Sequence, residues 1–189
     1  MENFIDWSKT ICFDTETTGL GKKAEILQLS IISGLGNILF DELIKPKHTT
    51  AWPQAEGVHH ISPDMVANKK QMDFHNPAII EILKNAEVYV GYNLPFDIRM
   101  LAQSGISTDL FYRKHCRRID VMEHFAPIYG EWDTVHKKYR WQNLVTCAAY
   151  CKYDWGDTEA HGALADSKAT LFCLKKLLTQ RRNLAKEVE

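Results

Sequence analysis

Two apolar stretches separated by a short run of turn residues constrain the fold most strongly. Residues 26–33 and 38–44 have the composition of strands, and residues 34–37, Gly-Leu-Gly-Asn, supply turn residues between them, so this region predicts a β-hairpin. Residues 10–13 form another apolar run, which predicts a strand. After the hairpin, predicted strands alternate with predicted helices. This order predicts an α/β fold with a central mixed β-sheet flanked by α-helices.

The later part of the chain supplies the helices. Short strands are predicted at residues 88–90 and 118–119, and Asp120 is suited to cap the helix that follows. Start and stop signals predict helices over four segments: from residue 76 or 77 to 85, 95–104, 141–151 and 163–182. Residues 45–73 are expected to be mostly loop, and so long a loop is more often functional than idle. The charged residues 183–189 are expected to fray.

The overall composition excludes several classes of protein. The 189 residues are 45% hydrophobic and 25% charged, and they are expected to form one domain, residues 1–189, with a core at about 10–178. These values exclude an intrinsically disordered chain, a collagen-like chain and a small disulfide scaffold. A net charge of −1 argues against a protein that coats nucleic acid non-specifically. Any contact with nucleic acid is therefore expected to be local, through a patch or a metal.

The five cysteines and the N-terminus predict where the protein works. Their number is odd and no Cys-x-x-Cys pair occurs, which is typical of a reduced, intracellular chain. Cys147 and Cys151 lie four residues apart, and burial as small residues is favoured over a zinc site because no second pair matches them. The N-terminus lacks signal-peptide features, and no apolar run approaches the roughly 20 residues of a membrane span. A cytoplasmic protein with no membrane partner is expected.

The segment Asp14-Thr15-Glu16 carries the strongest chemical signal. Strand side chains alternate between faces, so Asp14 and Glu16 point the same way at the end of an apolar strand, before a turn expected at residues 17–19. Two adjacent carboxylates repel each other unless a cation lies between them, and hard oxygen ligands favour Mg²⁺ or Mn²⁺ over zinc. Taken alone, the pattern more often marks a solvated strand end.

Two later segments place polar residues where the chain enters a helix. Asn93 follows an apolar strand and Asp97 lies in the first turn of the next helix, where capping and helix-end electrostatics also explain them. His161 and Asp166 would not share a face of one continuous helix, because five residues turn it by about 140°. If His161 lies in the loop before the helix, both side chains can reach one site. A surface or capping histidine is the alternative.

The order D-x-E, N-x-x-F-D and H-x₄-D is far more specific than any of its parts. With these motifs the chain resembles the DEDDh group of 3′–5′ exonucleases, which includes exonuclease X and the proofreading exonuclease subunit of the bacterial replicative polymerase. The resemblance covers about residues 10–178. Residues 57–66 are also similar to the loop ahead of the second motif, although His60 stands where many members have Gly. The resemblance implies a ribonuclease H-like fold.

The resemblance also implies a metal site and a general base. Asp14, Glu16 and Asp166 would hold one divalent ion, Asp14 would reach a second, and Asp97 would help, partly through water. Two Mg²⁺ or Mn²⁺ ions can clamp the attacking and leaving oxygens of a phosphodiester. His161 would take a proton from the attacking water, since imidazole titrates near neutral pH.

Further positions are expected to contact the terminal nucleotide. The resemblance implies such contacts for Thr17, Thr18 and Leu20. Further candidates for substrate binding are His59 and Phe96, through stacking or phosphate contacts, and Thr15 and Asn93. A core position is an equal alternative for Leu20 and for Phe96. Residues 113–118 and 137–141 mix cations with aromatics and could guide a strand toward the site, whereas a solvated face is the plainer interpretation.

The function expected from these observations is a metal-dependent 3′–5′ exonuclease that releases nucleoside 5′-monophosphates from single-stranded ends, with DNA favoured. An exoribonuclease is the close alternative, because contacts to the 2′-hydroxyl cannot be placed from sequence. A non-catalytic module that binds a nucleic-acid end or a partner is disfavoured, because all five polar motif residues are present. A zinc hydrolase is disfavoured because His59 and His60 are adjacent. Whether a polymerase is a partner is left open.

Overall fold

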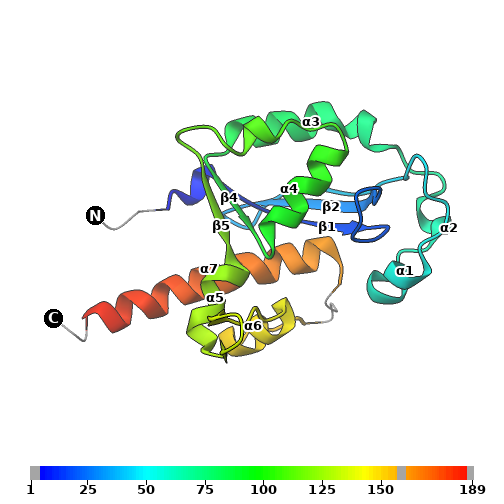
Figure 1. Ribbon diagram of the computed structural model, residues 1–189. Coiled ribbons are helices and arrows are strands. Elements are labelled where there is room, and N and C mark those ends of the chain that lie inside the picture. The colour runs from blue at the N-terminus through cyan, green and yellow to red at the C-terminus, as the bar shows by residue number, and fades with distance from the viewer. Residues whose placement is uncertain (1–4, 157–160, 187–189) are drawn as a thin grey trace.

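The computed structural model describes residues 5–156 and 161–186, and a β-sheet forms its middle layer (Figure 1). Within these residues the sheet has five strands in the order β3-β2-β1-β4-β5. The strands are β1 (Thr10–Thr17), β2 (Ile26–Ser33), β3 (Ile38–Leu43), β4 (Val88–Gly91) and β5 (Arg117–Asp120). β2 runs antiparallel to β1 and β3, whereas β4 runs parallel to β1 and β5. The predicted hairpin and mixed sheet are confirmed.

β1 is the central strand, and it is longer than the predicted residues 10–13. Its pairing with β2 continues to Thr17, past an irregularity between Glu16 and Thr17, because β2 is long enough to supply partners. β4 pairs only with the first part of β1, from Thr10 to Cys12. The second half of β1 therefore runs past the paired part of β4 and lies beside the helix that follows β4.

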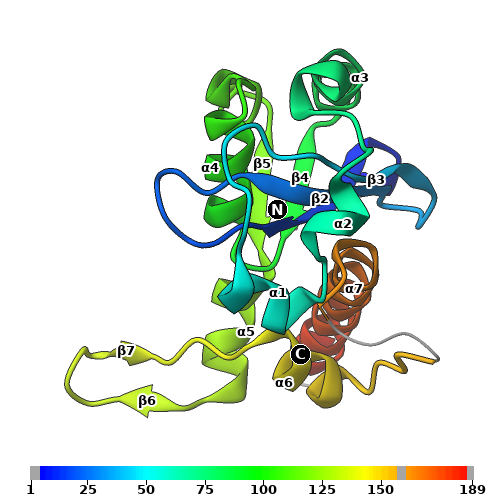
Figure 2. The same cartoon turned by 90° about the vertical axis from the view of Figure 1, so that its right-hand side faces the viewer.

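Helices cover both faces of the sheet (Figures 1 and 2). One face carries α3 (Met72–Asn85) and α4 (Leu94–Gln103), and the other carries α5 (Val121–Tyr129), α6 (Leu144–Cys151) and α7 (Ala163–Lys186). Strand residues alternate between the two cores: Phe13 packs with the α3 and α4 side, whereas Cys12 packs with the α7 side. This alternation decides which face each residue of β1 serves.

The segment predicted as loop, residues 45–73, contains two short helices, α1 (Pro53–His59) and α2 (Pro63–Val66). Each has a proline in its first turn, which suits that position because no intrahelical donor is lost there. Trp52 is buried and donates its indole N–H to the carbonyl of Ile61 at 2.7 Å. A small apolar cluster around Trp52 therefore folds this segment against the end of the sheet.

His60 ends α1 in the left-handed region, with φ of +59°. A side chain is disfavoured there by contact between Cβ and the backbone, and glycine is not. Many members of the family that the sequence resembles carry Gly at this position, and the backbone conformation here favours Gly.

Three predicted helix boundaries differ from the structure by three residues or more. α3 begins at Met72, because this residue is buried and its packing holds the first turn. Pro77 therefore lies inside the helix, where its missing N–H leaves one backbone hydrogen bond unmade. α6 begins at Leu144, because the side chain of Asn143 caps it by accepting the N–H of Thr146 at 2.8 Å. α7 continues to Lys186, so residues 183–186 are helical rather than frayed, and residues 187–189 lie outside the described part.

A small hairpin between α5 and α6 was not predicted. Its strands, β6 (Trp132–Asp133) and β7 (Lys138–Tyr139), have two residues each, too few to show an alternating pattern in the sequence. Figure 2 shows this hairpin projecting from the body of the molecule. Among the described residues, no helix combines the length and the apolar character that crossing a membrane would require.

Candidate active site

Asp14 and Glu16 lie on the face of β1 that packs against α7. Cys12, two residues before Asp14 on that face, donates its thiol hydrogen to the carbonyl of Ser167 in α7 at 3.4 Å. Because side chains two residues apart share a face, both carboxylates point toward the start of α7. Both are half-buried, as the end of the strand leaves them partly open.

Asp166 lies in the first turn of α7, and β2 anchors that turn. The backbone N–H of Ala163 donates to the side-chain oxygen of Gln28 at 3.2 Å, and the hydroxyl of Ser167 lies 3.5 Å from the carbonyl of Ser30. These contacts bring Asp166 to the two acids of β1. Carboxylate oxygens of Asp14, Glu16 and Asp166 all lie within 4.8 Å of one another.

Asp97 joins this group from the other side of β1. It lies in the first turn of α4 and is 2% exposed. One oxygen, Oδ1, accepts both the backbone N–H of Thr15 at 3.1 Å and its hydroxyl at 2.7 Å. Thr15 points to the α4 face, so this contact fastens Asp97 to β1 at the residue between Asp14 and Glu16, although Asp97 does not belong to the cluster of oxygens within 4.8 Å.

Burial and mutual repulsion raise the pKa of the carboxyls on β1 and α4. Desolvation is the largest cause for Asp14, whose pKa is raised well above its usual range, followed by repulsion from Asp97, Glu16 and Asp166. Burial and repulsion from Asp166 raise the pKa of Glu16 to about 7. Burial also raises the pKa of Asp97 to about 8, against the two hydrogen bonds from Thr15, which favour the charged form.

His161 lies in the loop immediately before α7, the placement that lets it share a site with Asp166. Its φ is +77°, its side chain is exposed, and its backbone N–H donates to Oδ1 of Asp166 at 3.2 Å. Burial raises the pKa of Asp166, although this backbone hydrogen bond and the charge of His161 act in the opposite direction. The backbone of His161 is thus held beside Asp166, and its side chain is exposed.

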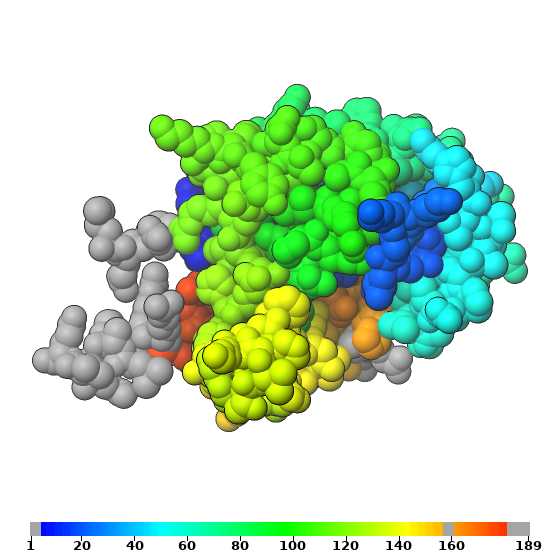
Figure 3. Space-filling view, viewed as in Figure 1, coloured from blue at the N-terminus to red at the C-terminus, as the bar shows by residue number. Residues whose placement is uncertain are grey.

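Figure 3 shows a hollow on this side of the molecule, with the start of α7 (orange) at its base. α4 (green) bounds it above, and residues 18–25 (blue) and α1 (cyan) bound it on the right. Residues of α6 and the segment before it (yellow) bound it on the left. The first turn of α7, which carries Asp166, therefore lies at the base of the hollow.

The residues predicted to contact substrate divide into two sets. Leu20 is 78% exposed, which excludes the core alternative, and its carbonyl accepts a hydrogen bond from Arg99 at 3.3 Å. Arg99 also lies 5.1 Å above the ring of Phe96, which is half-buried. Arg99 is a residue that sequence reasoning missed. It lies three residues after Phe96, close to one helical turn further along α4, and the only signal for it in the sequence is a basic residue next to the motif.

Thr17, Thr18 and His59 make contacts within the protein. The hydroxyl of Thr17 donates to the carbonyl of Gly19 at 2.8 Å, and that of Thr18 accepts the N–H of Glu25 at 3.0 Å. His59 is buried; its Nδ1 accepts the N–H of Ile61 at 3.0 Å and its Nε2 lies 3.2 Å from the carbonyl of Thr17. A carbonyl only accepts, so Nε2 carries the proton. The ring of His59 thus connects the end of β1 to the end of α1.

Asn93 and Asp120 together set the start of α4. Asn93 is exposed in the left-handed region, with φ of +64°, and its side chain makes no capping bond. Its backbone N–H donates to Oδ1 of Asp120 at 3.0 Å, and the same oxygen caps α5 by accepting the N–H of Met122 at 3.0 Å. The predicted cap role of Asp120 is confirmed, and the residue also positions the segment that leads to Asp97.

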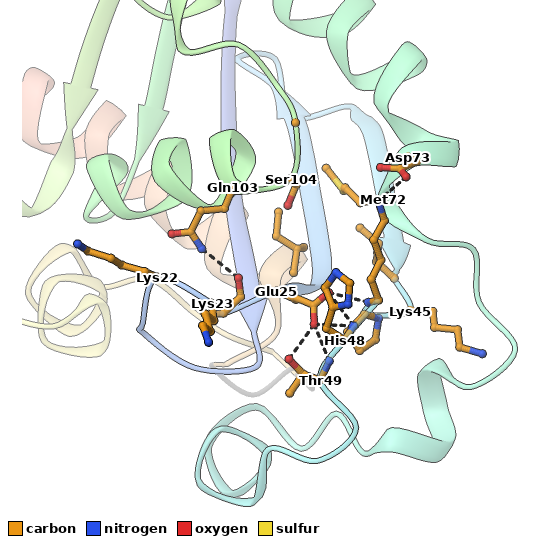
Figure 4. Close-up of a pocket in the computed structure, with 16 residues that line it drawn as sticks. Lys22, Lys23, Glu25, Lys45, His48, Thr49, Met72, Asp73, Gln103 and Ser104 are labelled. Carbon is orange, nitrogen blue, oxygen red and sulfur yellow. Dashed lines mark hydrogen bonds and ion pairs between the residues drawn. The ribbon is translucent and has the colours of Figure 1, made fainter.

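A cavity of about 800 Å³ is lined by none of the four acids (Figure 4). It is lined by the β1–β2 connection, the end of α4, the start of α3 and the segment after β3. At its wall the carboxylate of Glu25 accepts the backbone N–H groups of Lys47, His48 and Thr49 and the hydroxyl of Thr49. These bonds fasten two loops together, and none of the motif acids lines the cavity.

A second cluster of possible ligands lies in the core. The thiols of Cys147, Cys151 and Cys173 are buried and lie within 4.8 Å of one another. They belong to the apolar cluster between α6, α7 and the sheet. The predicted burial of Cys147 and Cys151 is confirmed, and Cys173 of α7 joins them.

Comparison with known proteins identifies the family. The family model RNase_T, described as exonuclease, matches residues 11–173. The chain belongs to the RNase T family of exonucleases. An uncharacterized exonuclease of Escherichia phage 186 is 34% identical over 167 residues, which cover 85% of this chain and 84% of the phage protein. The predicted family and ribonuclease H-like fold are confirmed.

Solved structures of other exonucleases share the fold. Exonuclease X in complex with 5′-overhanging duplex DNA matches with a TM-score of 0.65 and 22% identity, over 90% of this chain and 92% of that one. The Saccharomyces cerevisiae Pan2 module in complex with AAGGAA RNA matches with a TM-score of 0.64 and 14% identity, over 92% of this chain and 29% of that one. At these identities the likeness concerns the fold.

Enzymes of the RNase T family depend on divalent metal ions, and the acidic residues of this chain fit that requirement. Three carboxylates with oxygens within 4.8 Å of one another are the hard donor set that divalent cations prefer. Without a cation, burial and repulsion favour their protonated forms. The chain is thus a nuclease of a metal-dependent family whose acids are gathered for metal binding.

Proposed function

We propose that this exonuclease removes nucleotides one at a time from the 3′ end of single-stranded nucleic acid, with DNA as the expected substrate, and releases nucleoside 5′-monophosphates. The observation that carries the proposal is the meeting of Asp14, Glu16 and Asp166 within 4.8 Å, with Asp97 fastened beside them through Thr15. His161 lies exposed at the edge of this group. These are the residues expected from the 3′–5′ exonuclease motifs.

In this proposal the four acids hold two Mg²⁺ or Mn²⁺ ions. Bound there, the ions would neutralise the carboxylates and stabilise the attacking and leaving oxygens of the phosphodiester. His161 takes the proton from the attacking water, and the exposed position of its ring leaves it open to that water. The bond between phosphorus and the 3′ oxygen of the preceding nucleotide breaks, and that oxygen takes up a proton from water. The shortened strand thereby gains a 3′-hydroxyl, so the next nucleotide presents the same end.

Leu20, Arg99 and Phe96 are proposed to receive the terminal nucleotide. Leu20 is exposed at the rim, and Arg99 lies between it and the ring of Phe96. An apolar side chain, a guanidinium and an aromatic ring together offer contacts to a base and to a phosphate. We propose that Asn93 borders this place and that Thr15, Thr17, Thr18 and His59 shape it from beneath.

The similarity of this fold to that of exonuclease X bound to DNA supports DNA as the substrate. RNA is the second candidate, because the Pan2 module bound to RNA also shares the fold.

The test uses single-stranded DNA, duplex DNA and RNA labelled at the 5′ end, with Mg²⁺, Mn²⁺ or a chelator. Shortening in single-nucleotide steps from the 3′ end, abolished by chelator and by Asp14→Asn, is expected. Label that leaves at once as a mononucleotide would mean the opposite polarity. No shortening of any substrate would favour a binding module.

A further inference from the structure

The β6–β7 hairpin, residues 132–139 with the flanking residues 131, 140 and 141, forms an arm to which the proposed catalytic mechanism assigns no role. Glu131 and Arg140 join its two legs through a backbone hydrogen bond of 2.8 Å and an ion pair of 3.2 Å. The side-chain amide of Gln142 adds a bond of 2.9 Å to the carboxylate of Glu131. The arm therefore has internal bonds that hold its shape while it projects from the body (Figure 2).

Aromatic side chains gather on this arm without being buried. Trp132, Tyr139 and Trp141 are all exposed, Trp141 by 56%. Trp132 and Tyr139 meet edge to face, with ring centroids 5.0 Å apart. Exposed apolar surface grouped on a projecting element is typical of an interaction site, because an isolated fold gains nothing from it.

Cations accompany the rings. The ammonium of Lys138 lies 4.7 Å from the ring centroid of Trp141, and Lys137 is exposed at the turn. Arg140 is paired with the carboxylates of Glu131 and Asp133, so its charge is compensated. Aromatic rings interleaved with uncompensated lysines match the chemistry of a single strand, whose bases stack and whose phosphates are anionic.

The base of the hairpin is fastened to the segment that carries the site. The hydroxyl of Tyr92 donates toward the carbonyls of Gln142 and Asn143, at 2.9 and 3.0 Å. Tyr92 directly precedes Asn93, at the start of α4. Figure 2 shows the hairpin projecting on the same side as α4 and residues 18–25, which bound the hollow. The hairpin and the elements that bound the hollow therefore lie on the same side of the molecule, and Tyr92 connects them.

We propose that the β6–β7 hairpin binds the unpaired part of the substrate strand, on the 5′ side of the nucleotide being removed. Tyr139 and Trp141 stack on bases, and Lys137 and Lys138 face phosphates. The inference rests on the proposed exonuclease function. It adds a binding site that depends on substrate length, because a very short oligonucleotide fills the hollow without reaching the arm.

The test compares a trinucleotide with a long single strand in Trp141→Ala and, separately, Lys138→Gln. For Trp141→Ala, KM for the long strand is expected to rise about ten-fold, from the loss of one stacked base, while kcat and all values for the trinucleotide stay unchanged. Phe74→Ala is the matched control: Phe74 is exposed on α3 with the ammonium of Lys70 5.4 Å from its ring centroid. Phe74→Ala is expected to leave KM and kcat unchanged for both substrates.

Three results would overturn the proposal. The first is an unchanged KM for the long strand. The second is an equal loss of activity on the trinucleotide and the long strand, which would mean that the hairpin supports the acids through Tyr92. The third is a rise in KM confined to duplex substrates, which would assign the arm to the complementary strand. A wild-type protein that degrades neither oligonucleotide would instead refute the exonuclease proposal itself.

Discussion

Thr15 and Asp97, 82 residues apart in the chain, share two hydrogen bonds at a single carboxylate oxygen. Thr15 points to the face of β1 opposite to that of Asp14 and Glu16. Its contact with Asp97 holds the start of α4 at the strand, and Asp97 thereby joins the two carboxylates of β1. The pair thus connects the helix layer above the sheet to a site whose other acids face the layer below.

Thr15→Val is expected to weaken this connection while keeping the size and the backbone bond of the residue. Loss of the hydroxyl bond to a buried carboxyl is expected to lower the free energy of unfolding by about 1–2 kcal/mol, and to raise the Mg²⁺ concentration needed for half-maximal activity. Urea unfolding and metal titration of activity measure these effects. Thr170→Val is the matched control, because the buried hydroxyl of Thr170 has no partner and its loss is expected to be neutral or stabilising.

The raised carboxyl pKa values predict a pH dependence for the metal-free protein. The pKa of Glu16 rises from 4.5 to about 7 and that of Asp97 from 3.8 to about 8, mainly through burial. Over that window the folded state holds protons that the unfolded state has lost, so the contribution of these groups to stability falls as pH rises from about 5 to about 8. Saturating Mg²⁺ is expected to remove most of this fall.

Urea unfolding across this pH range, with chelator or with Mg²⁺, tests the prediction. Glu16→Gln is expected to flatten the slope in chelator, because it removes one of the titrating groups. The same pH dependence with and without Mg²⁺ would show that these acids do not bind the ion. Calorimetry in buffers of different ionisation enthalpy is expected to detect protons released on metal binding near pH 6.5.

The sequence predicted what depends on local patterns. The alternation along β1 places Asp14 and Glu16 together, and the motif order adds Asp97, His161 and Asp166, which the structure brings to one end of the sheet. The contacts between distant segments could not be predicted. No local pattern tells that Thr15 will bind Asp97, or that both ring nitrogens of His59 will face backbone groups.

Short elements were also beyond prediction, because their stability comes from tertiary packing. α1 and α2 have seven and four residues, and buried Trp52 holds the segment in place. The two-residue strands β6 and β7 depend on the bonds that Glu131 makes with Arg140. Each of these elements falls below the length at which hydrophobic periodicity carries information.

Substitution of His161 is expected to separate catalysis from folding. His161→Asn tolerates the φ of +77° and keeps the backbone bond to Asp166, whereas it loses the imidazole. A fall in kcat of about 10²–10⁴-fold with unchanged metal affinity and thermal stability is expected for loss of a general base. His161→Ala is expected to behave alike in kcat. His48→Asn, at an exposed histidine that lines the cavity without motif acids, serves as control, and full activity of the His161 variants would refute the assigned role.

His60→Gly tests whether the backbone of the loop after α1 stores strain. His60 has φ of +59°. This conformation destabilises the folded state by about 1 kcal/mol for a residue with a Cβ atom, and glycine adopts it without that penalty. Part of that gain is offset by the greater freedom of glycine in the unfolded chain. A rise in Tm of about 1–3 °C is expected, measured by calorimetry at fixed Mg²⁺. His60→Ala keeps the unfavourable φ and is expected to give no rise, so equal Tm values for the two variants would show that strain at His60 is not what limits this loop.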